Sequence, residues 1–297
     1  MNPFAGQKKA NRYLPEMLRL FSDYGYLTTA YMTGGPGDGA EFVRTHAHMA
    51  DLIVCVGGDG TLNEGIDGLL RSGVSCPMGY IPAGSTNDFA ASLGLSPSIM
   101  QAAQDIMEGK ERLIDLGSFN GRCFSYVASF GAFTEAAYST PQEAKNLLGH
   151  MAYIFEGVKD LANIHPTHLR VESNTGHVFE DDYIFGAISN STSIAGLLTM
   201  DPARVIMDDG LFEVTLIKMP ATLIDLSRIL SCLQTQQYDD ALIHSCTAAS
   251  VTIHSPSAVP WTLDGEYAKG ETEIVVNNLH NALRLMVKHD ETADELA

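Results

Sequence analysis

The chain of 297 residues carries 18 Lys and Arg against 36 Asp and Glu, a formal net charge of −18. Such a surface should repel nucleic acid and, in bulk, an anionic membrane, so a phosphate ligand needs backbone donors, a local cation or a divalent metal. The length allows two domains, no apolar stretch could span a bilayer, and five scattered cysteines with no signal peptide favour a cytoplasmic protein.

The first 115 residues alternate helix-like and strand-like segments. Apolar residues recur at helical spacing from Leu14 to Phe21, and Gly25 is typical of a helix end. The segments expected next are a strand at 26–32, a helix at 40–49, a strand at 52–56, a helix at 61–70, a strand at 78–81 and helices at 87–93 and 97–108. This alternation predicts a mostly parallel sheet covered by helices, with ligands beyond the carboxyl ends of the strands.

The second half has a different pattern. Asn120-Gly121 lies between two strand-like runs and predicts a hairpin. Further on we expect helices at 142–163 and 220–233 and strands at 168–173, 178–190, 211–218, 247–254 and 272–277. The sequence therefore predicts an α/β domain over 1–115 and a mainly antiparallel β-sandwich domain over 116–279, with 280–297 able to pack back on the first.

The N-terminus departs from what such a fold needs. An α/β domain of this type normally opens with an apolar strand that leads into the turn Asn2–Gly6, but here Met1 directly precedes that turn. Either the start lies upstream or the protein lacks its first strand, and the second case predicts a weakened first domain.

Residues 57–64, the first glycine turn, carry three glycines at the end of an apolar run. Glycine lets the backbone approach a ligand closely, and a helix N-terminus offers free N–H groups to an anion. Thr61 and Glu64 have the spacing of a capping box, so an ordinary strand-to-helix turn is an alternative. Asp59 favours a phosphate site that includes a metal or a donor group.

Two further turns have the same character. The second glycine turn, 82–89, joins a strand to a helix through Gly84 and Ser85, and the third, 33–39, follows an earlier strand. On neighbouring strands these turns would meet at one edge of the sheet. The Gly-x-x-x-x-Gly-Lys-Ser/Thr pattern is absent from the sequence, so this is not a P-loop protein.

Acidic residues recur beside strands in the second half. Asp208-Asp209-Gly210 precedes one expected strand, and Asp264-Gly265-Glu266 follows Trp261. Each could be a plain Asp-Gly turn, or a carboxylate that binds Mg²⁺ or accepts a proton.

Together these elements resemble the catalytic domain of the diacylglycerol kinase family, specifically the soluble bacterial lipid kinases, over almost the whole chain. The elements that carry the resemblance are Asn2-Pro3-x-x-Gly6, the three glycine turns, Ile114-Asp115, residues 141–153, residues 202–212 and Asp264-Gly265-Glu266. The Gly-Gly-Asp-Gly run alone is shared with NAD kinases and phosphofructokinases, whereas its combination with the later acidic elements is specific. Ser85 stands where Thr is more usual, and keeps the hydroxyl.

The resemblance implies an N-terminal domain like that of NAD kinases and phosphofructokinases, and transfer of the γ-phosphoryl group of ATP to a lipid hydroxyl with Mg²⁺. Glu266 would accept the proton, with Asp264 beside it, and Mg²⁺ would bind Asp209 and backbone oxygens near Ile206 and Leu211. The implied ATP-binding residues are Asn2, Gly6, Thr33, Gly57, Gly58, Asp59, Gly60, Thr61, Leu62, Asn63, Glu64, Gly84, Ser85, Asn87 and Asp88.

Diacylglycerol, giving phosphatidic acid, is the expected acceptor, met during transient contact with a membrane surface. Ile194, Leu197, Leu198 and Met200 are candidates for an apolar groove, or for ordinary core. A NAD kinase-like enzyme and a non-catalytic nucleotide- or lipid-binding relative stay open as alternatives. No nucleic-acid partner is expected, and a homodimer is compatible with the sequence without being specified by it.

Overall fold

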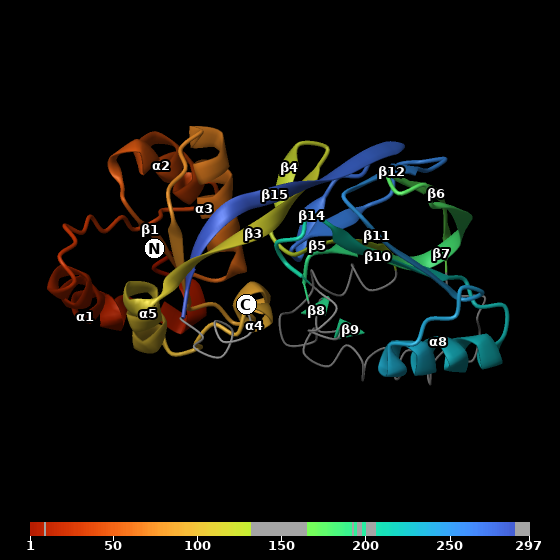
Figure 1. Ribbon diagram of the computed structural model, residues 1–297, viewed down its shortest axis with the longest axis horizontal. Helices are drawn as coiled ribbons and strands as arrows, with labels where there is room; N and C mark the ends of the chain where they lie inside the picture. Colours follow the sequence, from red (N-terminus) through yellow and green to blue (C-terminus); the bar gives the residue numbers. More distant parts are fainter. Residues whose placement is uncertain (9, 132–164, 192, 195–197, 200–205, 289–297) are drawn as a thin grey trace. The chain divides into compact units, whose positions relative to one another are not determined.

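The computed structural model describes residues 1–8, 10–131, 165–191, 193–194, 198–199 and 206–288 (Figure 1). The chain divides into two compact units, the first formed by Met1–Ile114 and Asn281–Ala297 and the second by Asp115–His280. The helix expected at 142–163, the motif at 141–153, and the groove residues Leu197 and Met200 lie outside the described residues.

A parallel sheet forms the centre of the first unit. Strand β1 (Ile53–Gly57) pairs in parallel with β2 (Met78–Pro82), and the C-terminal end of β15 (Glu273–Val287) continues the sheet beside β2. Strands buried on both faces are expected to be apolar throughout, and β2 is buried at all of its positions.

Helices cover this sheet (Figure 1). Met17 of α1 (Ala10–Asp23) and Ile106 of α5 (Ile99–Glu108) pack in one apolar cluster with Val56 and Ile81 of the two strands. The pair α2 (Asp38–His46) and α3 (Asp59–Ser72) packs closely through Gly68, where a Cβ would lie 2.3 Å from the Ala40 oxygen. The short elements of this unit are η1 (Ala5–Lys8), η2 (Ala47–Met49) and α4 (Asp88–Ser92).

The strand expected at 26–32 is wrong. These residues form no regular strand, and Leu27 is fully exposed. An isolated strand cannot satisfy its backbone groups through a ladder, and among the described residues the pairing found for this segment is the bond from the Met1 amino group to the Tyr31 oxygen.

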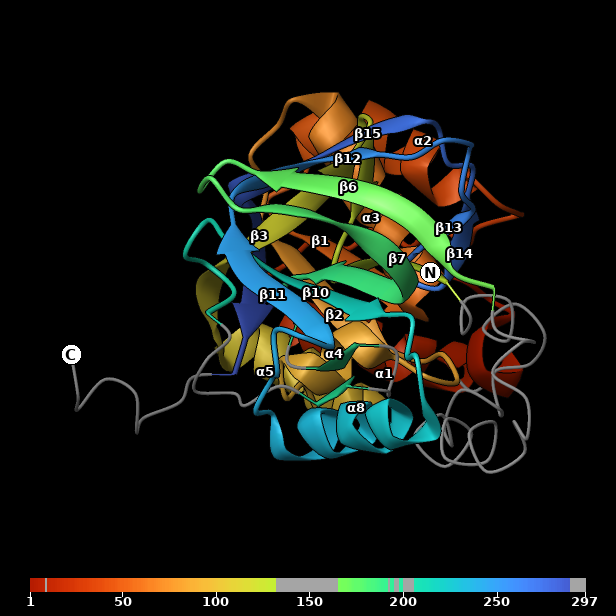
Figure 2. The same ribbon diagram turned by 90° about the vertical axis from the view of Figure 1, so that its right-hand side faces the viewer.

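The second unit is an antiparallel β structure (Figure 2). Long strand β7 (Val178–Ser189) is its centre, because its first half pairs with β6 (Thr167–Ser173) and its second half pairs with β5 (Val127–Gly131) and β10 (Phe212–Lys218). Strand β3 (Lys110–Phe119) begins in the first unit and ends in the second. The other elements among the described residues of the second unit are β4 (Arg122–Phe124), β8 (Ser193–Ile194), β9 (Leu198–Thr199), α8 (Leu223–Thr235), β11 (Ile243–Ala248), β12 (Ser250–His254), β13 (Trp261–Leu263) and β14 (Glu266–Ala268).

Aromatic side chains fill the interior of this unit. The Trp261 ring centroid lies 5.2 Å from that of Phe119 and 4.9 Å from that of Phe130, and all three residues are buried. The α/β class of the first unit and the antiparallel β-sandwich class of the second agree with the sequence prediction. None of the helices in the described part of the chain has the length and apolar character that a bilayer crossing requires.

Two strand boundaries differ from the prediction. The strand expected at 247–254 is two strands, because the chain breaks at Ala249, whose N–H donates to the Asn174 side chain. The strand expected at 272–277 continues to Val287 through a polar stretch that includes Asn278 and His280, which obscured the apolar alternation.

Candidate active site

The first and second glycine turns touch one another at the carboxyl ends of β1 and β2. A Cβ on Gly84 would lie 2.5 Å from the Cα of Gly58, and Ala83 N–H donates to the Gly57 oxygen at 2.7 Å. The turn that ends at Gly6 packs against the same place, because a Cβ there would lie 1.9 Å from the Ala83 oxygen. These contacts exclude side chains and leave a surface of backbone groups at the edge of the sheet.

Asp59 links the first turn to the second. Its carboxylate accepts hydrogen bonds from the backbone N–H of Asp88 (3.1 Å) and Phe89 (3.3 Å), the first residues of α4. Burial raises the pKa of Asp59, and these two donors oppose that rise. The first backbone N–H groups of α4 therefore act as donors to Asp59, which is one of the two alternatives that the sequence leaves open.

Glu64 links the first turn to the third, which corrects the expected capping box. Helix α3 begins at Asp59 with Gly58 as its N-cap, and no side chain caps it. The Glu64 carboxylate instead accepts hydrogen bonds from the N–H groups of Gly37 (2.7 Å) and Gly39 (3.0 Å). The capping prediction is wrong because the helix starts two residues earlier than expected, so Thr61 lies inside it.

The other predicted ATP-binding residues of the first unit surround these turns. Asn2 donates its N–H to the Val56 oxygen, Thr33 donates its N–H to the Met1 oxygen, and Ser85 is exposed. Asn87, at φ +56°, accepts a hydrogen bond from the Gly84 N–H and fixes the second turn. The Leu62 side chain is fully buried, so only its backbone is available to a ligand.

The Asp264-Gly265 pair forms the two-residue turn of the β13–β14 hairpin, with φ values of +51° and +81°. The Asp264 side chain is buried, and its carboxylate accepts four hydrogen bonds of 2.6–3.0 Å from the N–H groups of Ser125, Tyr126 and Val127 and from the Ser125 hydroxyl. Burial raises the pKa of Asp264, and these donors oppose the rise. This geometry fits a residue that positions the hairpin.

Glu266 lies two residues further on and has the opposite environment. Its side chain is 58% exposed, and Oε2 accepts a hydrogen bond from the Arg122 guanidinium at 3.2 Å. Arg122 also donates to the Tyr267 carbonyl at 2.8 Å, so it holds both the carboxylate and the strand that carries it. Sequence reasoning missed Arg122, which follows the predicted Asn120-Gly121 hairpin turn.

Asp115 fixes the loop that carries Asp209 through a hydrogen bond to its backbone. The Asp115 side chain is fully buried, and its Oδ2 accepts a hydrogen bond from Gly210 N–H at 2.6 Å. Oδ1 lies 2.9 Å from the His280 Nδ1, and the Asp115 N–H donates to the Met207 oxygen. Asp209 is exposed and accepts a hydrogen bond from Leu211 N–H.

The polar atoms around this loop include several oxygens that could act as metal ligands. Near this loop, three buried side-chain oxygens have no hydrogen-bond partner among the described residues: Asn190 Oδ1, Glu213 Oε2 and Asn278 Oδ1. Asn190 and Asn278 donate through their Nδ2 atoms to the backbone oxygens of Met207 and Leu211. Within the described residues no three His, Cys, Asp or Glu side chains form a metal cluster, so a cation here would use Asp209, backbone oxygens and water. Hard oxygen donors of this kind suit Mg²⁺.

Replacing Asp115 by Asn is expected to lower the free energy of unfolding by about 2–3 kcal/mol, because a buried charge-assisted hydrogen bond is weakened. The Gly210 amide should also exchange with solvent faster. Urea unfolding and hydrogen exchange measure these effects, and Asp208→Asn in the same loop, which is exposed, is the control. Unchanged exchange at Gly210 would remove Asp115 from this role.

Glu213 should make stability depend on pH. Burial raises the pKa of Glu213 from 4.5 to about 8, so the folded state favours the protonated form. The free energy of unfolding therefore keeps its full value from this group below pH 4.5, where Glu213 is protonated in both states. It falls by up to a few kcal/mol as the pH rises from 4.5 to about 8. In EDTA, Glu213→Gln should therefore flatten the decline of unfolding free energy between pH 5 and 8, whereas Glu271→Gln, which alters an exposed carboxylate, should not. Parallel curves for wild type and Glu213→Gln would contradict this.

Each of the two units matches a known protein family. The model of the diacylglycerol kinase catalytic domain matches residues 1–119, and that of the YegS C-terminal NAD kinase beta sandwich-like domain matches residues 127–287. A diacylglycerol kinase of Bacillus subtilis (strain 168) is 32% identical over 269 residues, which cover 90% of this chain and 88% of that protein.

Solved structures share the fold. The crystal structure of a proposed diacylglycerol kinase from Bacillus anthracis str. Sterne has a TM-score of 0.80 at 23% identity and covers 97% of this chain and 93% of that chain. An NAD kinase from Archaeoglobus fulgidus in complex with ATP has a TM-score of 0.50 at 12% identity, covering 98% and 92% of the two chains.

Proposed function

Because this chain belongs to the diacylglycerol kinase catalytic-domain family, we propose that it transfers the γ-phosphoryl group of ATP to the hydroxyl of diacylglycerol, forming phosphatidic acid. The observation that carries the proposal is the contact between Gly58 and Gly84, which creates a side-chain-free edge at the ends of two parallel strands. Phosphoryl transfer depends mainly on positioning and charge stabilisation, and this edge offers backbone donors for both.

In this proposal the first unit holds ATP. The N-terminus of α3 and the glycine turns around it present N–H groups to the phosphates. Asp59 and Glu64 hold the three glycine turns together by accepting four hydrogen bonds from backbone N–H groups. The phosphate-binding surface is therefore formed before the nucleotide binds. Pre-formed donors lose little freedom on binding, which favours affinity.

The second unit supplies the proton acceptor. Glu266 is the only residue of the Asp264–Glu266 turn whose carboxylate is exposed, and Arg122 orients it. A carboxylate within hydrogen-bonding distance of the lipid hydroxyl can take its proton as the oxygen attacks phosphorus. Asp264, with all of its contacts to the 125–127 turn, positions the hairpin that carries Glu266.

Mg²⁺ completes the proposal. Asp209 and the backbone oxygens of Ile206 and Leu211 would hold it, in a loop that Asp115 and Asn278 keep in shape. Bound Mg²⁺ supplies positive charge that offsets the negative charge of a phosphate-binding site. The protein would meet its acceptor during transient contact with a membrane surface, since its net charge of −18 disfavours stable attachment to anionic lipid.

The experiment offers one acceptor at a time to the protein with ATP and Mg²⁺: diacylglycerol, monoacylglycerol or sphingosine in mixed micelles, or NAD in solution. Mass spectrometry identifies the product. The proposal predicts phosphatidic acid and ADP in equal amounts, and no product in EDTA. Formation of NADP alone would instead assign a NAD kinase activity, and the absence of any product would favour a non-catalytic relative.

A further inference from the structure

Arg122 lies beside Glu266 and uses only part of its hydrogen-bonding capacity. One of its terminal nitrogens donates to Glu266 Oε2 at 3.2 Å, and the other donates to the Tyr267 carbonyl at 2.8 Å. A guanidinium carries five N–H groups, so three of them, the Nε–H included, donate to no residue in the described part of the chain. The Arg122 side chain is 47% exposed, which leaves these groups accessible to a ligand.

Arg284 shows how a guanidinium pairs when its role is only to bind a carboxylate. Its Nε and one terminal nitrogen donate to the two carboxylate oxygens of Glu111, at 2.8 and 2.9 Å. Such a forked pair matches the planar shapes of both groups. Arg122 instead contacts a single oxygen of Glu266, and Glu266 Oε1 has no partner among the described residues. The two side chains together therefore present a proton acceptor next to cationic donors.

The backbone on both sides of this pair is fixed. The turn before Arg122 is bound to β15, because Asn120 N–H donates to the Val275 oxygen at 3.0 Å and Asn120 Oδ1 accepts from Val275 N–H at 2.7 Å. The hairpin that carries Glu266 is bound through the Asp264 carboxylate to the backbone N–H groups of the 125–127 turn. The position of Arg122 relative to Glu266 is therefore set before a ligand binds, as a recognition site requires.

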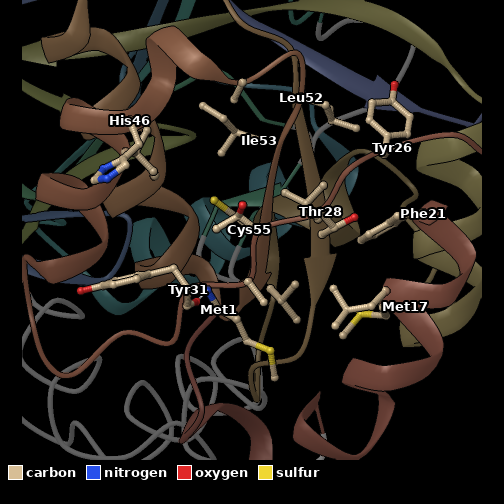
Figure 3. Close-up of a pocket in the computed structure, with 18 of the residues that line it drawn as sticks. Met1, Met17, Phe21, Tyr26, Thr28, Tyr31, His46, Leu52, Ile53 and Cys55 are labelled. Carbon is tan, nitrogen blue, oxygen red and sulfur yellow. Dashed lines mark hydrogen bonds between the residues drawn. The ribbon is translucent and has the colours of Figure 1, made fainter.

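A cavity in the first unit offers no comparable pair of side chains. Its volume is about 870 Å³, and it lies along β1 between Met17 and Phe21 of α1 and His46 of α2 (Figure 3). The described residues that line it include no Lys, Arg or Glu, and Asp51 is the one acidic residue among them. The pair formed by Arg122 and Glu266 is therefore the better match for the polar end of an acceptor lipid.

Acceptor lipids differ at the carbon atom next to the one that bears the reacting hydroxyl. In diacylglycerol this atom carries an ester, whose carbonyl oxygen accepts hydrogen bonds. In a dialkylglycerol it carries an ether, which has no carbonyl oxygen. In sphingosine it carries an amino group, which is positively charged at neutral pH. A guanidinium beside Glu266 would donate to the ester carbonyl and repel the ammonium group.

We propose that Arg122 is a specificity-determining residue, which donates a hydrogen bond to the ester carbonyl of an acylglycerol while Glu266 accepts the proton of its hydroxyl. The inference rests on the proposed lipid kinase function and extends it, because it assigns the choice among lipids to one side chain. Arg122 would select acylglycerols over ether lipids through the hydrogen bond and over amino alcohols through charge repulsion. Specificity of this kind combines an attractive contact with a repulsive one.

The test measures kcat/KM of the full chain for diacylglycerol, a dialkylglycerol of equal chain length and sphingosine, each at the same mole fraction in micelles of a nonionic detergent. The wild type should prefer diacylglycerol to the dialkylglycerol about tenfold or more, the usual effect of one hydrogen bond to a charged group. Arg122→Met removes the donors and the charge. It should bring this ratio close to one and increase the use of sphingosine relative to diacylglycerol.

Two further variants separate recognition from other effects. Arg122→Lys keeps the charge and loses the planar set of donors, so it should still discriminate against sphingosine and lose part of the preference over the dialkylglycerol. Arg122→Lys also serves as the test if Arg122→Met fails to fold. Arg170→Met alters another exposed arginine of the second unit and should leave every acceptor ratio unchanged.

An unchanged ratio of diacylglycerol to dialkylglycerol turnover in Arg122→Met would overturn the inference, even if both rates fell, because Arg122 would then only orient Glu266. Equal use of these two lipids by the wild type, or a wild-type preference for sphingosine, would overturn it as well. If the wild type phosphorylated none of the three lipids, the proposed function would fail together with the inference. The failure of the inference alone is therefore distinguishable from the failure of the proposed function.

Discussion

Replacing Glu266 by Gln is expected to lower kcat for lipid phosphorylation by about 10²- to 10⁴-fold, the usual contribution of a general base. Gln keeps the size of the side chain and can still accept a hydrogen bond from Arg122, but it cannot take a proton. Because Glu266 is exposed and its hairpin is held by Asp264, the substitution should leave folding and ATP affinity unchanged. Steady-state kinetics with diacylglycerol micelles and calorimetry with ATP measure the two effects separately.

The matched control for Glu266→Gln is Glu271→Gln, which removes the same charge from an exposed position in the same unit. Its kcat should equal that of the wild type. Acceptor-dependent turnover that survives in Glu266→Gln would remove Glu266 from the role of base. A rise in KM with unchanged kcat would assign it to lipid binding instead.

Gly84→Ala should weaken ATP binding about 100-fold or more. The added Cβ would lie 2.5 Å from the Gly58 Cα and 2.7 Å from the Asn87 side-chain oxygen, so the two turns cannot both keep their positions. Since the closer of the two clashes is with backbone, no rotamer change relieves it, and the backbone donors proposed to face the phosphates would move apart. A misplacement of about 1 Å in a catalytic site can cost about 100-fold in rate, and we expect a loss of similar size in the affinity for ATP.

Gly79→Ala separates this effect from a general packing defect. Gly79 lies on the same strand, β2, and a Cβ there would lie 2.8 Å from the Ile106 side chain, well inside the core. That variant should lose stability and keep ATP affinity, whereas Gly84→Ala should lose affinity. Equal ATP affinities for Gly84→Ala and wild type would show that the nucleotide does not use the contact between the turns.

Sequence analysis predicted those strands, helix starts and turns whose formation depends on residues close together in the chain. The apolar run at 52–56 and the glycines after it predicted β1 and the start of α3 to within two residues. Asn120-Gly121 predicted the β3–β4 turn, whose φ values of +46° and +86° suit these residue types. The strand at 26–32 failed because strand formation needs a partner, and sequence pattern alone does not reveal whether one is present.

The supporting residues of the site depend on contacts between distant positions. Arg122 reaches Glu266 across 144 positions of sequence, and Asp115 reaches Gly210 across 95. No local pattern indicates the first pair. Asp115 did carry a signal, since an acid within the apolar run Leu113–Leu116 is expected to be buried only with partners. Which of the predicted ATP- and metal-binding residues contact their ligands stays a prediction.

Calorimetric titration of the folded chain with ATP in magnesium buffer tests most directly whether backbone amides freed of side chains hold a polyanion on this acidic protein. One saturable site is expected, with affinity that survives Glu266→Gln and is lost in Gly84→Ala. No heat of binding from intact, folded wild-type protein, or full affinity in Gly84→Ala, would contradict the account.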